Sequence, residues 1–203
     1  MKIPLRITVL LAGIALQPLA WATPTTAQTD LENTLAQAIS TYDPNLSAPA
    51  TGDYENTLLI DQSSLLTNND NFAIGAQLQV NTSSGTITQA GSDNVAGIFQ
   101  VSGGGDSAII NQTGNANYAA VTQVGLNNAA NVSQQNNNNV LLLKQENGNN
   151  TANVTQTGNS NVNVHQTGND TANLTFQGSS TNPVTYSFTQ SPGSSWTYNV
   201  ITN

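Results

Sequence analysis

Glutamine recurs almost every eleven residues along most of this chain, and this period constrains the fold more than any other feature. The successive gaps are 11, 12, 11, 11, 11, 11, 10 and 11 residues. A short period sustained over so many copies is typical of a stacked repeat, in which each unit buries its inner surface against its neighbours. The glutamines of the series are Gln89, Gln100, Gln112, Gln123, Gln134, Gln145, Gln156, Gln166 and Gln177.

Within each repeat, the residues before the glutamine alternate in character with a period of two. Gln100 is preceded at two-residue steps by Ile98, Ala96 and Asn94, and most other repeats follow the same order of Asn, small apolar, larger apolar and Gln. This period predicts a β-strand, because successive side chains of a strand point to opposite faces. One face of each strand should therefore carry the Asn, the two apolar residues and the Gln.

Glycine stands two residues after the glutamine in many repeats, where the predicted strand ends. Gly and Asn accept positive φ more readily than other residues, so this position predicts a tight turn. Asn136 and Asn147 replace the glycine in two repeats. The predicted turn glycines are Gly91, Gly114, Gly125, Gly158 and Gly168.

Weaker repeats extend the series to Gln62 at one end and Gln190 at the other. After Gln166 the register is ambiguous, and either Phe176 or Gln177 can take the glutamine position. We predict an all-β fold, a β-solenoid of about six stacked strand–turn–strand rungs with about 22 residues each, prone to form amyloid. A last strand is predicted at Trp196, Tyr198, Val200 and Thr202.

Stacking also satisfies the side-chain amides that this pattern buries. A buried primary amide costs free energy unless it is bonded, but in a stack each amide can donate to one neighbour and accept from the other. Only the end rungs remain open, and open strand edges recruit further strands. The predicted self-assembly ladder comprises Asn56, Gln62, Asn71, Gln77, Gln89, Asn94, Gln100, Gln112, Asn117, Gln123, Asn128, Gln134, Asn139, Gln145, Asn150, Gln156, Gln166 and Gln177.

Three regions follow one another along the chain. Residues 1–22 are predicted to be a secretory signal peptide, because they combine a basic start, an apolar stretch over 7–16 and a small-residue cleavage site ending at Ala22. Residues 56–203 are predicted to form the solenoid, with an irregular last rung from about residue 179. Apart from the leader, no stretch is apolar enough to span a membrane. The region between them, 23–55, is predicted to be flexible or weakly helical, with one side formed by Leu31, Leu35, Ala38 and Ile39.

Composition excludes several classes of function. Removal of the leader would leave Lys144 as the only basic side chain besides His165, against 11 acids, for a formal charge of −10. Such a surface disfavours nucleic acid and anionic membranes as partners. The chain has no Cys and one His, which excludes Cys nucleophiles and multi-histidine metal sites. The acids lie scattered in predicted turns, so we expect no enzymatic activity, no cofactor and no metal.

The repeat Gln-x-Gly-x-x-Asn-x-Ala-x-x-x-Gln resembles that of the curlins, the subunits of curli amyloid fibres. It occurs without departure over 89–100, 112–123 and 123–134, and the resemblance covers about residues 71–178. It implies a subunit that Gram-negative bacteria secrete through a dedicated outer-membrane pore with accessory factors. It further implies cross-β fibres of the biofilm matrix at the cell surface, which bind surfaces and contain the chain itself and a second curlin subunit. Curlins carry an export signal just after the leader, so 23–55 is expected to have that role.

A monomeric, secreted β-solenoid that acts as a binding module or adhesin is the alternative. Such proteins cap their ends and present a flat, regular array of side chains. The predicted outer face here is irregular, which disfavours a lattice-matching surface. It places in one column Phe99, Asn111, Thr122, Ser133, Lys144, Thr155 and His165.

Overall fold

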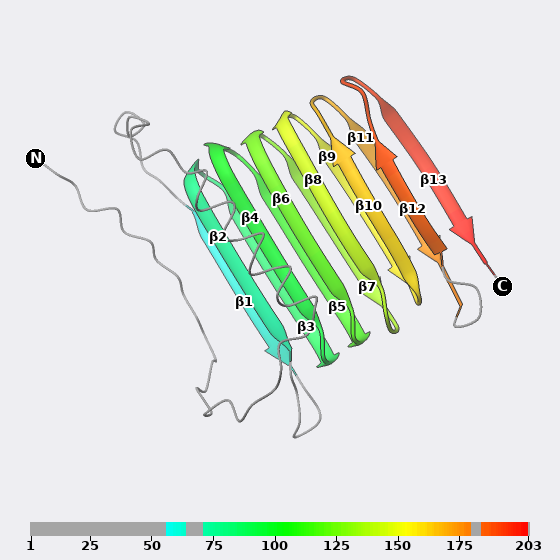
Figure 1. The fold of residues 1–203 in the computed structure, drawn as a ribbon. Coiled ribbons are helices and arrows are strands. Elements are labelled where there is room, and N and C mark those ends of the chain that lie inside the picture. The colour runs from blue at the N-terminus through cyan, green and yellow to red at the C-terminus, as the bar shows by residue number, and fades with distance from the viewer. Residues whose placement is uncertain (1–55, 64–70, 180–183, 203) are drawn as a thin grey trace, which may run out of the picture.

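The computed structural model describes residues 56–63, 71–179 and 184–202, so the predictions for 1–22 and 23–55 lie outside the described residues. All regular secondary structure within these ranges is β-strand (Figure 1). The strands are β1 (Thr57–Ser63), β2 (Phe72–Asn81), β3 (Ser84–Ser92), β4 (Val95–Gly104), β5 (Ser107–Asn115), β6 (Tyr118–Leu126), β7 (Ala129–Gln135), β8 (Val140–Gly148), β9 (Thr151–Thr157), β10 (Ser160–Gln166), β11 (Thr171–Gln177), β12 (Val184–Thr189) and β13 (Ser195–Ile201).

Successive strands alternate between two parallel sheets. Sheet A has the order β1-β3-β5-β7-β9-β11-β13, and sheet B has the order β12-β10-β8-β6-β4-β2. Each strand pairs with the strand two places further along the chain, and one turn takes about 23 residues over about six turns. This confirms the predicted all-β solenoid and its last strand, with a turn about one residue longer than predicted. The column runs from β1 and β2 at its N-terminal end to β12 and β13 at its C-terminal end (Figure 1).

Equivalent residues of successive turns lie in register. Ile98 pairs with Val121, and Gln100 pairs with Gln123, between β4 and β6. The same alignment of glutamines joins β3 to β5 and β5 to β7. Because parallel strands lie about 4.8 Å apart, each side chain meets its counterpart directly above and below.

The interior between the two sheets is narrow and apolar. Small residues such as Ala96 and Ala119 alternate along the strands with larger ones such as Ile98 and Val121, and all four are fully buried. One strand cannot bury this inner face alone, so the core exists only when the turns are stacked. The core is flanked on both sides by the Asn and Gln positions.

The outward-facing residues differ between the two sheets, which corrects the single irregular column predicted from the sequence. On sheet B, Phe99 aligns with Thr122, which aligns with Lys144 and then His165. The rest of the predicted column lies on the opposite side of the solenoid, on sheet A: Asn111, Ser133 and Thr155. Alternate repeats enter opposite sheets, so residues eleven positions apart never share an outer face.

Candidate functional site

Two columns of glutamine side chains run through the solenoid, one along each sheet. In sheet B, Gln100 Nε2 donates to Gln123 Oε1 at 2.9 Å, and each glutamine repeats this bond to the next. We call these sets Gln column A (Gln62, Gln89, Gln112, Gln134, Gln156) and Gln column B (Gln77, Gln100, Gln123, Gln145, Gln166, Gln190). All donors in both columns point toward the C-terminal end, so the columns have a direction.

The second amide proton of each interior glutamine ties the two sheets together. Gln123 Nε2 in β6 also donates to the carbonyl oxygen of Ser107, the first residue of β5 in the opposite sheet, at 2.9 Å. Gln134 Nε2 in β7 donates likewise to Tyr118 O of β6 at 2.8 Å. Both protons of a buried amide are thereby satisfied, which removes the cost of burying it.

Asparagine columns lie at the strand starts and donate in the opposite direction. In sheet B, Asn117 Nδ2 donates to Asn94 Oδ1 at 3.0 Å, and Asn139 Nδ2 donates to Asn117 Oδ1 at 2.9 Å. In sheet A, Asn150 Nδ2 donates to Asn128 Oδ1 at 2.9 Å. Gln and Asn donors therefore point toward opposite ends of the column.

The predicted ladder residues fall into three groups. Those from Gln89 through Gln166 are at most 1% exposed. The first-turn members Asn56, Gln62, Asn71 and Gln77 are exposed or half-buried, yet each forms a hydrogen bond with the next turn. The third group is Gln177 alone, at the C-terminal end of the series.

That residue, Gln177, is misplaced in the predicted ladder. It is exposed on the outer face of β11, whereas Phe176 is fully buried and aligns with Gln156 of β9. Gln column A therefore ends at Gln156, whose Nε2 donates to Ser160 O at 3.0 Å in place of a further glutamine.

Two acids that the sequence analysis placed in turns are instead members of the sheet A asparagine column. Asp106 and Asp170 are at most 1% exposed. Asp106 Oδ1 accepts from the backbone N–H and Nδ2 of Asn128, and Asp170 Oδ1 accepts from Ser194 N. Their positions, six residues before Gln112 and before Phe176, match the spacing of Asn94 to Gln100, and this spacing could have identified them.

One oxygen of the Asp106 carboxyl lacks a hydrogen bond from the part of the chain that the structure describes. Its Oδ2 is buried and has no hydrogen-bond partner among the described residues. Burial raises the pKa of this carboxyl, while the two hydrogen bonds from Asn128 lower it by less. Asn139 Oδ1 is likewise buried without a partner in the described ranges, because the next turn has Ser160 at that position.

All five predicted turn glycines have positive φ. Gly91, Gly114 and Gly125 lie at +111°, +116° and +116°. A Cβ on Gly114 would lie 2.0 Å from the carbonyl oxygen of Asn136 in the next turn. These positions need glycine both for backbone conformation and for the close approach of stacked turns. The remaining two, Gly158 and Gly168, have φ of +69° and +127°.

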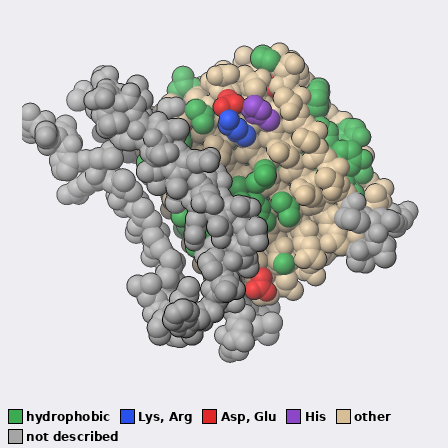
Figure 2. Space-filling view, in the orientation of Figure 1, with side chains coloured by type: hydrophobic (Ala, Val, Ile, Leu, Met, Phe, Trp, Pro, Cys, Tyr) green, Lys and Arg blue, Asp and Glu red, His purple; other side chains and the backbone are tan. Residues whose placement is uncertain are grey.

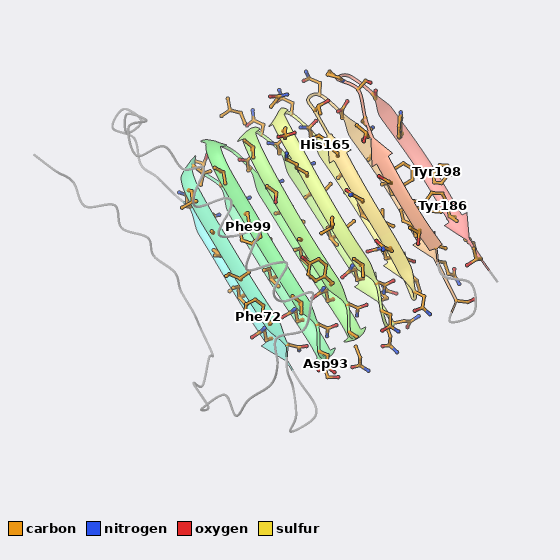
Figure 3. The ribbon with its side chains drawn as sticks, in the orientation of Figure 1. Phe72, Asp93, Phe99, His165, Tyr186 and Tyr198 are labelled. Atoms are coloured by element: carbon orange, nitrogen blue, oxygen red, sulfur yellow. The ribbon has the colours of Figure 1, made fainter. Side chains whose placement is uncertain are left out.

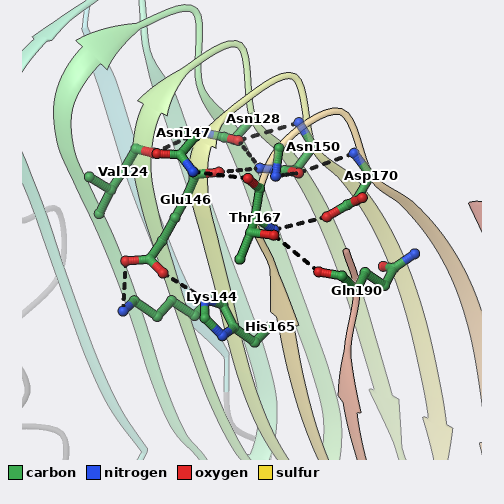
Figure 4. Close-up of polar contacts among 11 residues, drawn as sticks. Val124, Asn128, Lys144, Glu146, Asn147, Asn150, His165, Thr167, Asp170 and Gln190 are labelled. Carbon is green, nitrogen blue, oxygen red and sulfur yellow. Dashed lines mark hydrogen bonds and ion pairs between the residues drawn. The ribbon is translucent and has the colours of Figure 1, made fainter. Parts of the chain in front are cut away.

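Charged side chains gather at one place on the outer face of sheet B. Glu146 Oε1 lies 2.8 Å from Lys144 Nζ, and its Oε2 lies 2.6 Å from His165 Nε2 (Figures 2 and 4). The hydrogen bond from Lys144 lowers the pKa of the Glu146 carboxyl, and the His165 contact adds to this. Such exposed pairs contribute little to stability.

Within the described residues, no group of three or more acids and histidines is placed to hold a metal ion. No helix in these same ranges has the length and apolarity needed to cross a bilayer.

These observations define a parallel β-solenoid whose interior is crossed by continuous columns of amide hydrogen bonds. A family profile described as the curlin associated repeat matches residues 81–114 and 106–135. The chain therefore contains curlin associated repeats over these residues, which confirms the resemblance seen in the sequence. Comparisons with curated proteins and with solved structures find no match.

Proposed function

We propose that this chain is a structural subunit, secreted and polymerised end to end into cross-β fibres outside the bacterial cell. In this role the fibres belong to a curli-like biofilm matrix and mediate adhesion and aggregation. The partners are further copies of the chain and a second curlin subunit. An outer-membrane pore with accessory factors would export it. The observation that carries the proposal is that both Gln columns have a direction and begin at strands that, among the described residues, pair with a neighbour on one side only.

The N-terminal end offers hydrogen-bond acceptors. Gln62 and Gln77 donate to the next turn, and their own Oε1 atoms accept no hydrogen bond among the described residues. Strands β1 and β2 are edge strands of their sheets. An edge strand exposes unpaired backbone groups that can pair with another chain.

The C-terminal end offers a matching donor on sheet B. Gln190 Nε2 donates to Thr171 O at 2.9 Å, the bond that every interior glutamine makes, and its one other acceptor among the described residues is Ser194 O at 3.4 Å. If β12 of one copy stacks on β2 of the next, Gln190 aligns with Gln77 and the column continues. In the same register Phe188 aligns with Gly75, so a large side chain meets a small one.

The joint in sheet A is apolar. Trp196 and Tyr198 of β13 are 39% and 42% exposed, although they occupy inner positions of their strand. Stacking β13 on β1 would bring Trp196 over Leu58 and Tyr198 over Ile60. The burial of this aromatic surface would contribute about 25 cal/mol per Å² removed from water.

The test is polymerisation of the purified chain beginning at Thr23. We expect fibres with a cross-β diffraction pattern after a lag phase that preformed seed abolishes. Gln190→Ala should slow elongation, because it removes the donor at the joint. Thr189→Ala is the matched control, since Thr189 is exposed on the outer face of the same strand and should leave elongation unchanged. Monodisperse monomer after days at high concentration would overturn the proposal.

A monomeric binding module is the second candidate, and one observation favours it. Gln column A ends at Gln156 in β9, two strands before its sheet ends, because Phe176 takes the next position, so the last turn differs from the repeats and resembles a cap. A stable monomer in size-exclusion chromatography, unchanged by seed, would establish this alternative.

A further inference from the structure

The outer face of sheet A carries a regular array of small polar side chains. We call the outward-facing side chains of its seven strands face A. Most of them are threonine, serine or asparagine, and equivalent positions align from strand to strand. Asn153 Nδ2 donates to Asn173 Oδ1 at 2.8 Å, so side chains within a row can also bond to each other. The row that contains these two runs from β3 to β13 through Thr86, Ile109, Asn131, Asn153, Asn173 and Thr197.

Face A is exposed and unbroken. The pairing register of sheet A continues from β1 to β13 without a shift, whereas that of sheet B shifts between Val101 and Gly103. None of the outward side chains that the structure describes on this face is buried. Leu59, Ile109 and Ile201 add apolar surface, at 48%, 37% and 59% exposed. Face A therefore offers a partner one continuous surface of hydroxyl, amide and apolar groups.

Face A is nearly free of charge. Among its described residues, Asp61 in β1 has the one ionisable side chain. The outer face of sheet B, by contrast, carries Lys144, Glu146 and His165, the last of which is labelled in Figure 3. Copies of a chain with a net charge of −8 repel one another. Because this repulsion is weakest where the facing surfaces carry the fewest charges, face A is favourable for contact between copies.

We propose that two copies of this chain pack face A against face A. The rows of face A repeat at the strand spacing of about 4.8 Å, and a second copy presents rows with the same repeat. Small side chains on two such sheets can interdigitate, as they do in the dry interfaces between paired sheets. This match of spacing along all seven strands favours a copy of the chain over an unrelated partner.

The size of face A suits a stable pair. Its seven strands of at least seven residues each give a footprint of roughly 700 Å². A pair would bury roughly 1,400 Å² in total, within the roughly 1,200–2,000 Å² typical of specific, stable interfaces. A two-fold axis along β7, the central strand, places β1 of one copy opposite β13 of the other. The two Asp61 carboxylates then lie at opposite ends of the interface.

Cysteine variants test the pairing, because the chain has no cysteine of its own. Asn131→Cys places a thiol on β7, where face A of one copy would meet that of its partner. Asn163→Cys is the matched control, since Asn163 is an exposed asparagine on the outer face of β10 in sheet B. Each purified chain, beginning at Thr23, is treated at high concentration, before fibres form, with a bismaleimide that spans about 10 Å, the distance between packed sheets.

We expect covalent dimers of the Asn131→Cys variant and monomers of the Asn163→Cys variant. Equal cross-linking of the two variants, or none in either, would overturn the proposal. Because this assay uses soluble chain, its outcome is independent of polymerisation.

In fibres the inference rests on the proposed function, and it predicts two solenoids side by side. Asn131→Asp brings like charges together at the two-fold axis. The mass per unit length, measured by scanning transmission electron microscopy, should therefore fall by half relative to the unsubstituted chain. Asn163→Asp, with the same change in charge on sheet B, should leave the mass per unit length unchanged.

The two proposals fail in different ways. Equal mass per unit length in both Asp variants would overturn the pairing and leave the proposed function standing. Cross-linked dimers of a chain that never forms fibres would overturn the proposed function and leave the pairing standing.

Discussion

Phe176 occupies in β11 the register position that Gln156 occupies in β9. It therefore stands where a sixth member of Gln column A would stand. Its ring lies 5.6 Å from that of Tyr186 and 5.8 Å from that of Phe188, centroid to centroid. At this point the interior changes from amide bonding to aromatic packing, which continues through Tyr198 of β13.

Phe176→Ala should destabilise the C-terminal turn by about 3–5 kcal/mol, because a fully buried ring is lost and its neighbours collapse only partly into the cavity. Trp196 in β13 gives the readout, as the other tryptophan, Trp21, lies in the predicted leader. We expect its fluorescence to report unfolding at a lower urea concentration. Thr175→Ala, on the exposed face of the same strand, should leave the midpoint unchanged. Equal midpoints for both variants would contradict the aromatic packing.

Gln123→Ala should lower the free energy of unfolding by about 1–3 kcal/mol or more, because it leaves one amide proton of Gln100 Nε2 and the Oε1 of Gln145 buried without a partner, while Gln100 keeps its bond to Ser84 O. In the proposed fibre it should also slow polymerisation. Thr122→Ala is the control, since the adjacent Thr122 faces outward. Urea denaturation of the monomer and seeded growth kinetics measure the two effects. Identical behaviour of the two variants would refute the inward role of the amide.

Asp106→Asn should stabilise the protein at neutral pH by about 1–3 kcal/mol, because it replaces a buried, unsatisfied carboxylate oxygen with an amide of the kind found at Asn128 and Asn150. Burial raises the pKa of this carboxyl in the folded state. Between the ordinary pKa of Asp, about 3.9, and the raised value, the folded state binds more protons than the unfolded state. Stability must then fall as pH rises through that window and remain reduced above it.

Urea unfolding at a series of pH values tests this dependence. In the Asp106→Asn variant, the dependence of the unfolding free energy on pH should lose the contribution that Asp106 makes to it. Asp93→Asn serves as the control, because Asp93 is exposed in a turn and carries the same change in charge. An equal gain in stability from both variants would attribute the effect to net charge alone.

Gly114→Ala should destabilise the fold by about 2–3 kcal/mol, because its φ of +116° is unfavourable for alanine and its new Cβ would lie 2.0 Å from Asn136 O. Gly193→Ala provides the comparison, with φ of +83° but nothing within 4 Å of the added atom. It should cost only about 1 kcal/mol. Thermal unfolding followed by circular dichroism would rank the two variants. A larger loss at Gly193 would contradict the close stacking of turns.

Much of the candidate site could be predicted from the sequence because a period of two assigns each residue to a face. Asn94, Gln100 and their counterparts were identified in this way. Asp106 and Asp170 were missed because their acidic character outweighed their spacing. Phe176 and Gln177 could not be separated, since a shift of one residue exchanges the two faces and both registers fit the surrounding residues.

The sequence by itself determined the period, the approximate number of rungs and the inward positions of every ladder amide but Gln177, because all three depend on local alternation and turn chemistry. Only the tertiary structure decided which outward residues share a face, since successive repeats enter opposite sheets. It also decided the direction in which each amide donates, because either orientation satisfies an isolated pair. The bond from each glutamine to the opposite sheet selects one of them, and that contact joins residues such as Gln123 and Ser107, which meet only after the chain has turned.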